Sequence, residues 1–227
     1  PHLRDGNLLF VHAQAPSDVE RAIQMTGTAT LSWLASHAPR AANVTTHETA
    51  THVAIAATDE ATGDFVALEA VPPAVVATPM RDFLRRAALT EGVALYLAQP
   101  DDAQLRGARK EAVAIARTQV GKPYADFYQP PPAAFYCSSL VDYAFAQAAG
   151  TPSPFTFGVD FKLLFVPAEF WSKYYAQMNR SLPVNVSGSN PTLLLHSRRL
   201  AYRKVPPREL LSELVGDDRV DLSADAS

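Results

Sequence analysis

The single cysteine of the chain, Cys137, lies where a thiol could become a nucleophile. A stiff Gln129-Pro130-Pro131-Pro132 stretch precedes it, and apolar residues at helical spacing over 140–148 predict a helix that begins around Cys137 and ends at Gly150. The positive end of a helix dipole stabilises a thiolate, and the free N–H groups of the first turn can bind an oxyanion. This placement suits acyl transfer. The alternative is that Cys137 is a small buried apolar side chain.

His52 and Glu69 are the candidates for a base and for the acid that orients it. His52 begins an apolar strand predicted over 52–56, and Glu69 lies on a second strand predicted over 65–70, with polar residues 58–64 as the turn. Across such a hairpin a carboxylate can accept the second imidazole N–H and fix the tautomer. Taken singly, each residue could instead be a strand-end side chain at the surface.

Other chemical motifs fail on spacing. His47 and His52 are five residues apart rather than the four of zinc proteases, in a Thr-rich stretch without helical periodicity. The sequence has no nucleophile-elbow serine, no phosphate-binding loop and no dinucleotide fingerprint. We therefore expect neither a metal nor a cofactor. The remaining histidines are interpreted as surface or loop residues: His2, His12, His37 and His196.

Composition indicates one globular catalytic domain, which we assign to residues 1–215. The 227 residues are 48% hydrophobic and 19% charged, which allows a sizeable core, whereas 216–227 are small, polar and acidic and are expected to form a disordered tail. The net charge of -3 gives no reason to expect nucleic acid as a partner. No run approaches the roughly 20 apolar residues that cross a bilayer, so we expect no integral membrane span.

The compartment stays open. One cysteine excludes an internal disulfide without indicating a redox environment. The first residues lack the apolar stretch of a signal peptide, whereas the start at Pro1 is compatible with a removed leader and with export to the periplasm or the exterior of a bacterium.

Periodicity and capping signals predict the other elements. The additional strands are 8–11, 74–76 and 93–97. The additional helices are 18–25, one that begins at the Thr78-Pro79 pair and ends before Gly92, and one from Asp101 or Asp102 through Gln119 that buries Val120. Residues 27–50, interpreted as an insertion that could form a lid, and the chain from Thr151 onward are expected to be irregular.

In this order the segments resemble the YiiX/YebB-like branch of the NlpC/P60 superfamily, whose members have a circularly permuted papain-like fold. The matching pieces span most of the chain: 5–10, 51–55, 68–70, 121–124, 136–141 and 188–191. Two positions depart from the pattern. Ser139 stands where the family usually has Glu, and Asn7 stands where Asp is common. Neither change removes one of the three proposed catalytic residues, but both could alter local charge or substrate choice.

The resemblance implies an α+β fold in which an antiparallel sheet or barrel packs against helices that include the nucleophile helix. It also implies Cys137 as nucleophile, His52 as base, Glu69 as orienting acid, and Tyr124 as a residue that lines the site and donates to the oxyanion. The expected function is hydrolysis of amide bonds through an acyl-enzyme. Peptidoglycan stem peptides or related amide conjugates are the expected substrates, and an immunity or inhibitor protein would be a partner of an exported effector.

Two other functions stay open at this point. Relatives with the same permuted fold act on acyl chains, so a lipid acyltransferase or thioesterase is the second prediction. Its apolar groove could be lined by five aromatic residues, for which a place in the ordinary core is the favoured alternative: Phe155, Phe157, Phe161, Phe165 and Trp171. The third is a non-catalytic binding module, against which the three intact residues argue.

Overall fold

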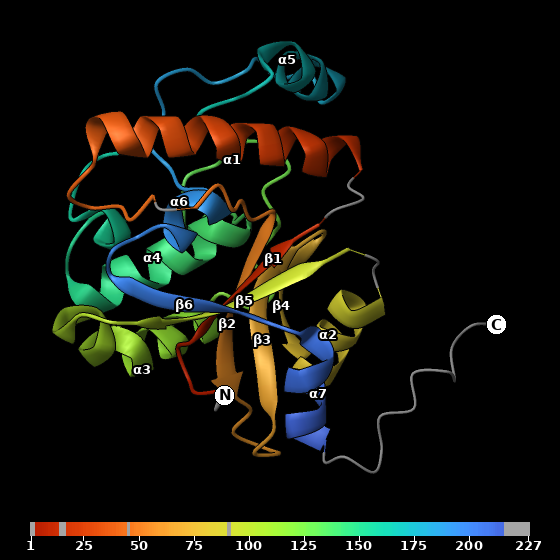
Figure 1. Ribbon diagram of the computed structural model, residues 1–227. Coiled ribbons are helices and arrows are strands. Elements are labelled where there is room, and N and C mark those ends of the chain that lie inside the picture. Colours follow the sequence, from red (N-terminus) through yellow and green to blue (C-terminus); the bar gives the residue numbers. More distant parts are fainter. Residues whose placement is uncertain (1–2, 14–16, 45, 90–91, 216–227) are drawn as a thin grey trace.

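A six-stranded antiparallel sheet forms the centre of the protein (Figure 1). The computed structural model describes residues 3–13, 17–44, 46–89 and 92–215. The strands run in the order β4-β3-β2-β1-β5-β6. Their bounds are β1 (Leu8–His12), β2 (His52–Thr58), β3 (Phe65–Val71), β4 (Ala74–Pro79), β5 (Ala94–Pro100) and β6 (Leu200–Val205). The predicted α+β class and the predicted antiparallel sheet are confirmed.

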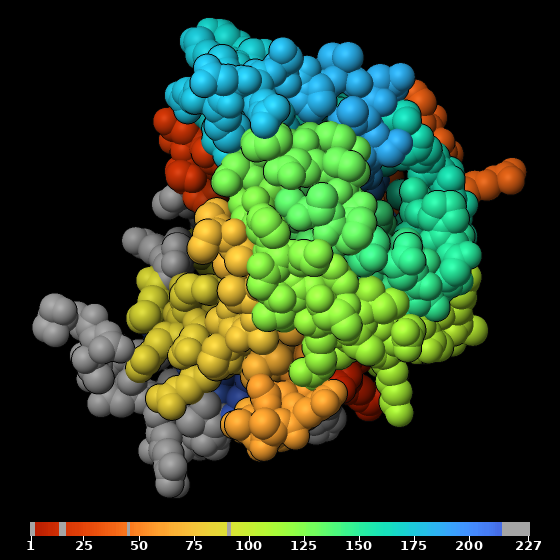
Figure 2. Space-filling view, turned by 180° about the vertical axis from the view of Figure 1, so that it is seen from behind, coloured from red at the N-terminus to blue at the C-terminus, as the bar shows by residue number. Residues whose placement is uncertain are grey.

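Helices cover both faces of the sheet. One face packs against α3 (Ala103–Thr118) and α4 (Cys137–Ala149), and the other packs against α2 (Met80–Leu89) and α7 (Pro207–Val215). At one end lie α1 (Asp18–His37), α6 (Pro191–Leu195) and the outermost helix, α5 (Ala168–Gln177), which Figure 1 shows beyond α1. In the rear view of Figure 2 the yellow segment that includes α2 is at the surface beside the orange β2–β3 hairpin.

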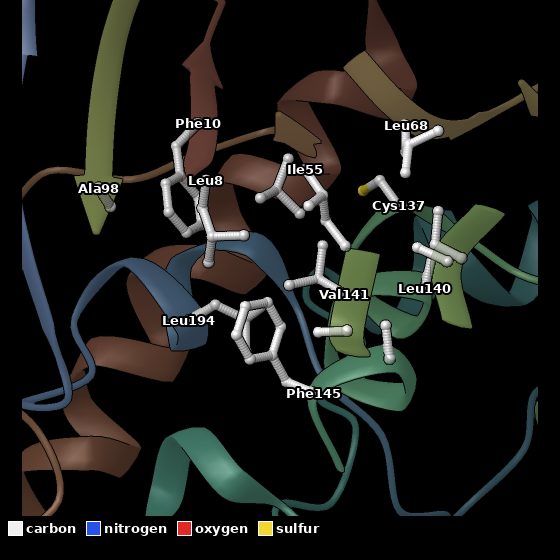
Figure 3. Close-up of a cluster of buried hydrophobic side chains, with 14 of the residues drawn as sticks. Leu8, Phe10, Ile55, Leu68, Ala98, Cys137, Leu140, Val141, Phe145 and Leu194 are labelled. Carbon is white, nitrogen blue, oxygen red and sulfur yellow. The ribbon is translucent and has the colours of Figure 1, made fainter. Parts of the chain in front are cut away.

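Side-chain alternation divides the core between the two faces. Leu8 and Ile55 join the cluster against α4, whereas Leu9 and Ala54 join the cluster against α2 and α7. Because both faces are covered, the central strands are apolar on both sides rather than alternately polar. Figure 3 shows the first cluster, in which Cys137 lies beside Leu68.

The first helix is longer than the sequence indicated. The helix expected to end at Met25 continues to His37, so the prediction of irregular chain from residue 27 is wrong there. Gly27 and the threonines nearby have poor helix propensity, but Thr30, Leu31 and Leu34 are buried, and packing outweighs propensity in most protein helices. The predicted insertion therefore becomes a helix followed by an irregular stretch up to β2.

The chain after Thr151 is also more regular than expected. It contains α5, α6, β6 and α7, which the sequence analysis assigned to irregular structure. The short helix α6 is capped by Asn190, whose Oδ1 accepts a hydrogen bond from the Leu193 N–H at 2.8 Å. β6 is an edge strand with charged residues, a composition that gives no strong strand signal.

Three smaller predictions need correction. Thr78 and Pro79 end β4 instead of starting α2, and Val120 is 46% exposed because the chain turns away at Gly121, whose φ is 88°. His196 is fully buried instead of lying at the surface, with Nε2 2.8 Å from the Glu48 carbonyl oxygen. The proposed tail, 216–227, lies outside the described residues, and the assignment of 1–215 to one domain stays a prediction. No helix in the described part of the chain is long and apolar enough to cross a membrane.

Two helical glycines provide a matched test of this packing. A Cβ at Gly27 would lie 2.6 Å from Thr192 Oγ1, which is itself held by hydrogen bonds to the backbone of Ala50, whereas a Cβ at Gly107 would have no neighbour within 4 Å. We expect Gly27→Ala to lower the free energy of unfolding by about 1–3 kcal/mol. Gly107→Ala should raise it by about 0.5–1 kcal/mol through helix propensity. Urea unfolding of both variants measures this, and a Gly27→Ala protein as stable as wild type would contradict it.

Candidate active site

His52 and Glu69 meet on one face of the β2–β3 hairpin. The strands pair with Ile55 opposite Leu68, so alternation places His52 and Glu69 together on the face that α2 covers. His52 Nε2 lies 2.7 Å from Glu69 Oε2. The Glu69 side chain is fully buried and the His52 side chain is 22% exposed. The cross-strand contact that the sequence predicted is present.

Two residues that sequence reasoning missed complete the surroundings of Glu69. The Thr78 hydroxyl and Arg86 Nη2 each donate to Glu69 Oε1 at 2.6 Å. Burial opposes ionisation of Glu69, but the hydrogen bond and charge of His52 and the bonds from Thr78 and Arg86 outweigh burial and lower the pKa of Glu69 to about 2. Glu69 is therefore a carboxylate at neutral pH.

Cys137 is the first residue of α4, as the sequence predicted. Tyr136 is the extended N-cap, and its N–H donates to Ser139 Oγ at 3.0 Å, while the Ser139 hydroxyl donates back to the Tyr136 carbonyl at 2.9 Å. A glutamate at this position could make the same capping contact, but it would place a negative charge near the sulfur. Ser139 caps the helix without that charge.

The Cys137 side chain interacts with the His52 ring. Burial lowers the pKa of His52, but hydrogen bonds and charge interactions with Cys137 and Glu69 prevail and raise the pKa to about 10. The ring is therefore an imidazolium at neutral pH. The sulfur therefore lies beside an imidazolium and at the start of α4. The structure thus brings Cys137, His52 and Glu69 together from three separate elements.

Cys137 lies in the wall of a cleft that encloses about 790 Å³, including solvent at its mouth. Helices α1 and α5 and the segments 124–128, 163–165 and 189–191 form the rest of the wall. Aromatic side chains dominate the lining: Tyr124, Phe127, Tyr128, Tyr136, Phe165, Trp171, Tyr174 and Tyr175. Asp126 contributes a carboxylate, and no Lys, Arg or His is among the described lining residues. The cleft therefore suits an apolar group next to the sulfur.

Tyr124 is the fourth residue that the sequence singled out, and it lines this cleft with Cys137. Backbone contacts hold Tyr124 in place. Its N–H donates to the Pro73 carbonyl oxygen at 2.9 Å, and it forms an isolated β-bridge with Phe135. Burial and the nearby Cys137 raise the pKa of Tyr124 far above its usual value. Its phenol consequently stays protonated and can donate a hydrogen bond.

The sequence carried only weak signals for the missed residues. Thr78 was interpreted as a helix cap because a proline follows it, yet its hydroxyl points to Glu69 from the end of β4. Arg86 lies on an amphipathic helix among other arginines, and its side chain is 56% exposed, as expected of a surface charge. Nothing in the spacing distinguishes it from Arg81 or Arg85.

Comparison with known proteins agrees with this geometry. Residues 2–200 match the family described as permuted papain-like amidase enzyme, YaeF/YiiX, C92 family. The chain belongs to this family. The permuted papain-like amidase is thus a cysteine hydrolase, which confirms the predicted family branch and enzyme class. Its inclusion in the wider NlpC/P60 superfamily stays a prediction.

One solved structure shares the fold of this amidase. The crystal structure described as metalloprotein YiiX from Escherichia coli O157:H7 aligns with a TM-score of 0.62 and 17% sequence identity, over 88% of this chain and 96% of that chain. At this identity the likeness concerns the fold. No curated protein sequence matches the chain. Among the residues described here, no group of three or more His, Cys, Asp or Glu could hold a metal ion.

Titration of His52 tests the electrostatics of this site. The folded protein should hold the His52 proton up to a pKa of about 10, whereas the pKa of a free histidine side chain is 6.5. The stabilisation from the protonated ring is therefore complete below pH 6.5 and is lost as the pH rises from 6.5 through 10. NMR of the ring nitrogens measures the titration, and denaturation of wild type and His52→Gln against pH measures the stability. A His52 ring already neutral at pH 8 would contradict this expectation.

Proposed function

We propose that Cys137, His52 and Glu69 form the catalytic triad of this amidase, with Cys137 as nucleophile, His52 as acid and base, and Glu69 as the residue that orients the ring. The contact chain from the Cys137 side chain, which lines a cleft, through the His52 ring to the buried Glu69 carboxylate is the observation that supports the proposal. The arrangement matches the general logic of a nucleophile activated by an oriented base.

The proposed reaction has two steps. The Cys137 thiolate attacks the carbonyl carbon of the amide, and the N–H groups at the start of α4 and the Tyr124 hydroxyl stabilise the oxyanion. His52 then gives its proton to the leaving nitrogen, the C–N bond breaks, and a thioester with Cys137 remains. In the second step His52 takes a proton from water and the resulting hydroxide attacks the thioester. The C–S bond then breaks, the carboxylic acid leaves, and the thiolate is restored beside the imidazolium.

The substrate proposal follows from the cleft. Peptidoglycan stem peptides, the first expectation, carry carboxylates, for which the described lining residues offer no cationic partner. The aromatic lining favours an amide conjugate with an apolar acyl group, and it supports a lipid acyltransferase or thioesterase as the second candidate. Two of the five aromatic residues proposed for that groove, Phe165 and Trp171, do line the cleft. Phe155 and Phe161 are buried, and Phe157 is 58% exposed outside the cleft.

Substitution of the three residues tests the triad. Cys137→Ala should abolish release of amine from an N-acyl amide, because no nucleophile remains, and His52→Ala should lower kcat/KM by orders of magnitude while the fold is retained. Glu69→Gln should cost less, since the ring keeps a neutral hydrogen-bond partner. Product release is followed by chromatography and folding by circular dichroism. Equal activity of wild type and the three variants would refute the proposed triad.

A substrate panel tests the proposed class. The wild-type enzyme is incubated with an N-acyl amide of long chain, with purified peptidoglycan and with phospholipid vesicles, with Cys137→Ala as the blank. We expect turnover of the N-acyl amide, and Trp171→Ala should raise KM for long acyl chains more than for short ones because an apolar wall is lost. Phe157→Ala, an aromatic substitution outside the cleft, is the control. Release of muropeptides alone would contradict the apolar assignment.

A further inference from the structure

The strand β4 and the helix α2 bring two different donors to one buried oxygen. Thr78, near the end of β4, and Arg86, on α2, both donate to Glu69 Oε1 at 2.6 Å. Glu69 Oε2 faces His52 instead, at 2.7 Å. The two carboxylate oxygens therefore have separate partners: one oxygen is bound by the β4–α2 segment and the other by the imidazole.

The Phe83 ring lies close to both cations. The centroid of its ring lies 5.7 Å from the Arg86 guanidinium carbon and 6.4 Å from the centroid of the His52 ring. Phe83 is 2% exposed and belongs to the core beneath α2. The guanidinium and the imidazole thus contact one rigid ring and are joined electrostatically through Glu69.

Arg86 matters most when His52 is neutral. A buried carboxylate without a compensating charge tends to take up a proton. While His52 is an imidazolium, Glu69 has two positive neighbours, but in the proposed reaction His52 gives its proton to the leaving nitrogen. At that stage Arg86 supplies positive charge at Glu69, whereas Thr78 supplies a hydrogen bond without charge.

We infer that Arg86 is a positioning residue of the amidase, which acts through Glu69 to keep that carboxylate ionised and the His52 ring oriented throughout the reaction. The inference rests on the proposed role of His52. Arg86 does not line the cleft, so its effect reaches the sulfur through Glu69 and His52. The β4–α2 segment thereby becomes part of the machinery although it holds none of the three proposed catalytic residues.

The direction of the effect follows from the charges that face each group. Glu69 faces the His52 ring from β2 and the Arg86 guanidinium from α2, and His52 faces Glu69 from β3 and Cys137 from α4. Glu69 stays ionised over the range in which His52 titrates, because its pKa lies near 2. Loss of the Arg86 charge removes a positive neighbour from the Glu69–His52 pair and leaves the carboxylate a stronger acceptor for the ring, so the pKa of His52 rises.

The experiment compares substitutions that remove a charge with one that removes a hydrogen bond. Arg86→Gln should raise the pKa of His52 by about one unit and move the alkaline limb of the pH profile upward by the same amount, with a fall in kcat/KM of about tenfold because the carboxylate that orients the ring is less firmly held. Arg86→Lys should retain most of the wild-type pKa because the charge is kept. Thr78→Val should lower the rate with a smaller change in the pKa. Arg81→Gln removes an exposed arginine from the same helix and should leave both unchanged.

The pKa of His52 is read by NMR, also in a Cys137→Ala background with its own unsubstituted reference, so that the readout does not require activity. A folded Arg86→Gln protein with the wild-type His52 pKa and pH profile would overturn the inference. Equal pKa shifts in Arg86→Gln and Arg81→Gln would overturn it as well, since the effect would then be one of net charge. If Arg86→Gln does not fold, Arg86→Met takes its place beside Arg86→Lys. The His52 pKa should shift in Arg86→Met and stay near the wild-type value in Arg86→Lys, and equal pKa and rate in the two folded variants would overturn the inference. The two proposals can fail separately. If the wild-type protein hydrolyses no amide but Arg86→Gln still shifts the pKa of His52, the proposed function is refuted and the coupling of Arg86 to His52 is supported.

Discussion

The buried carboxylate of Glu69 is the interaction on which the rest of the site depends. A charged group with no exposed surface is stable only where every lone pair has a partner and opposite charge is close. β2, β4 and α2 meet this requirement with one side chain each: His52, Thr78 and Arg86. The need to satisfy one carboxylate therefore fixes four elements relative to one another and sets the orientation of the imidazole.

The sequence revealed the parts of the site that follow from local rules. Alternation in two apolar strands placed His52 and Glu69 on one face, and a proline-rich stretch followed by helical spacing placed Cys137 at a helix start. The meeting of Cys137 with His52 depends on how α4 packs on the sheet, which no local pattern encodes, so the family resemblance had to supply it. The sequence analysis did not identify Arg86, because its position resembles that of an ordinary surface arginine. It did not identify the role of Thr78, because the proline that follows suggested a helix cap.

The same distinction explains the errors in the fold. The extension of α1 to His37 depends on the burial of Thr30, Leu31 and Leu34 against other parts of the chain, and tertiary contacts of this kind outweigh the low propensity of Gly27 and its neighbours. His196 was expected at the surface because histidine is usually exposed. Its ring is instead buried, and its two nitrogens lie within hydrogen-bonding distance of the backbone carbonyl oxygens of Asn43 and Glu48. Both cases depend on partners far away in the sequence. Asn190 donates to Thr30 across 160 residues, and the carbonyls beside the His196 ring are 153 and 148 residues away.

The two faces of the sheet carry different halves of the site. Cys137 belongs to the cluster packed by α4, whereas Glu69 and Phe83 belong to the side covered by α2. Cys137 is carried by α4 and its imidazole partner by β2. A change in how α4 packs on the sheet would therefore separate the sulfur from the ring even if every bond to Glu69 were kept.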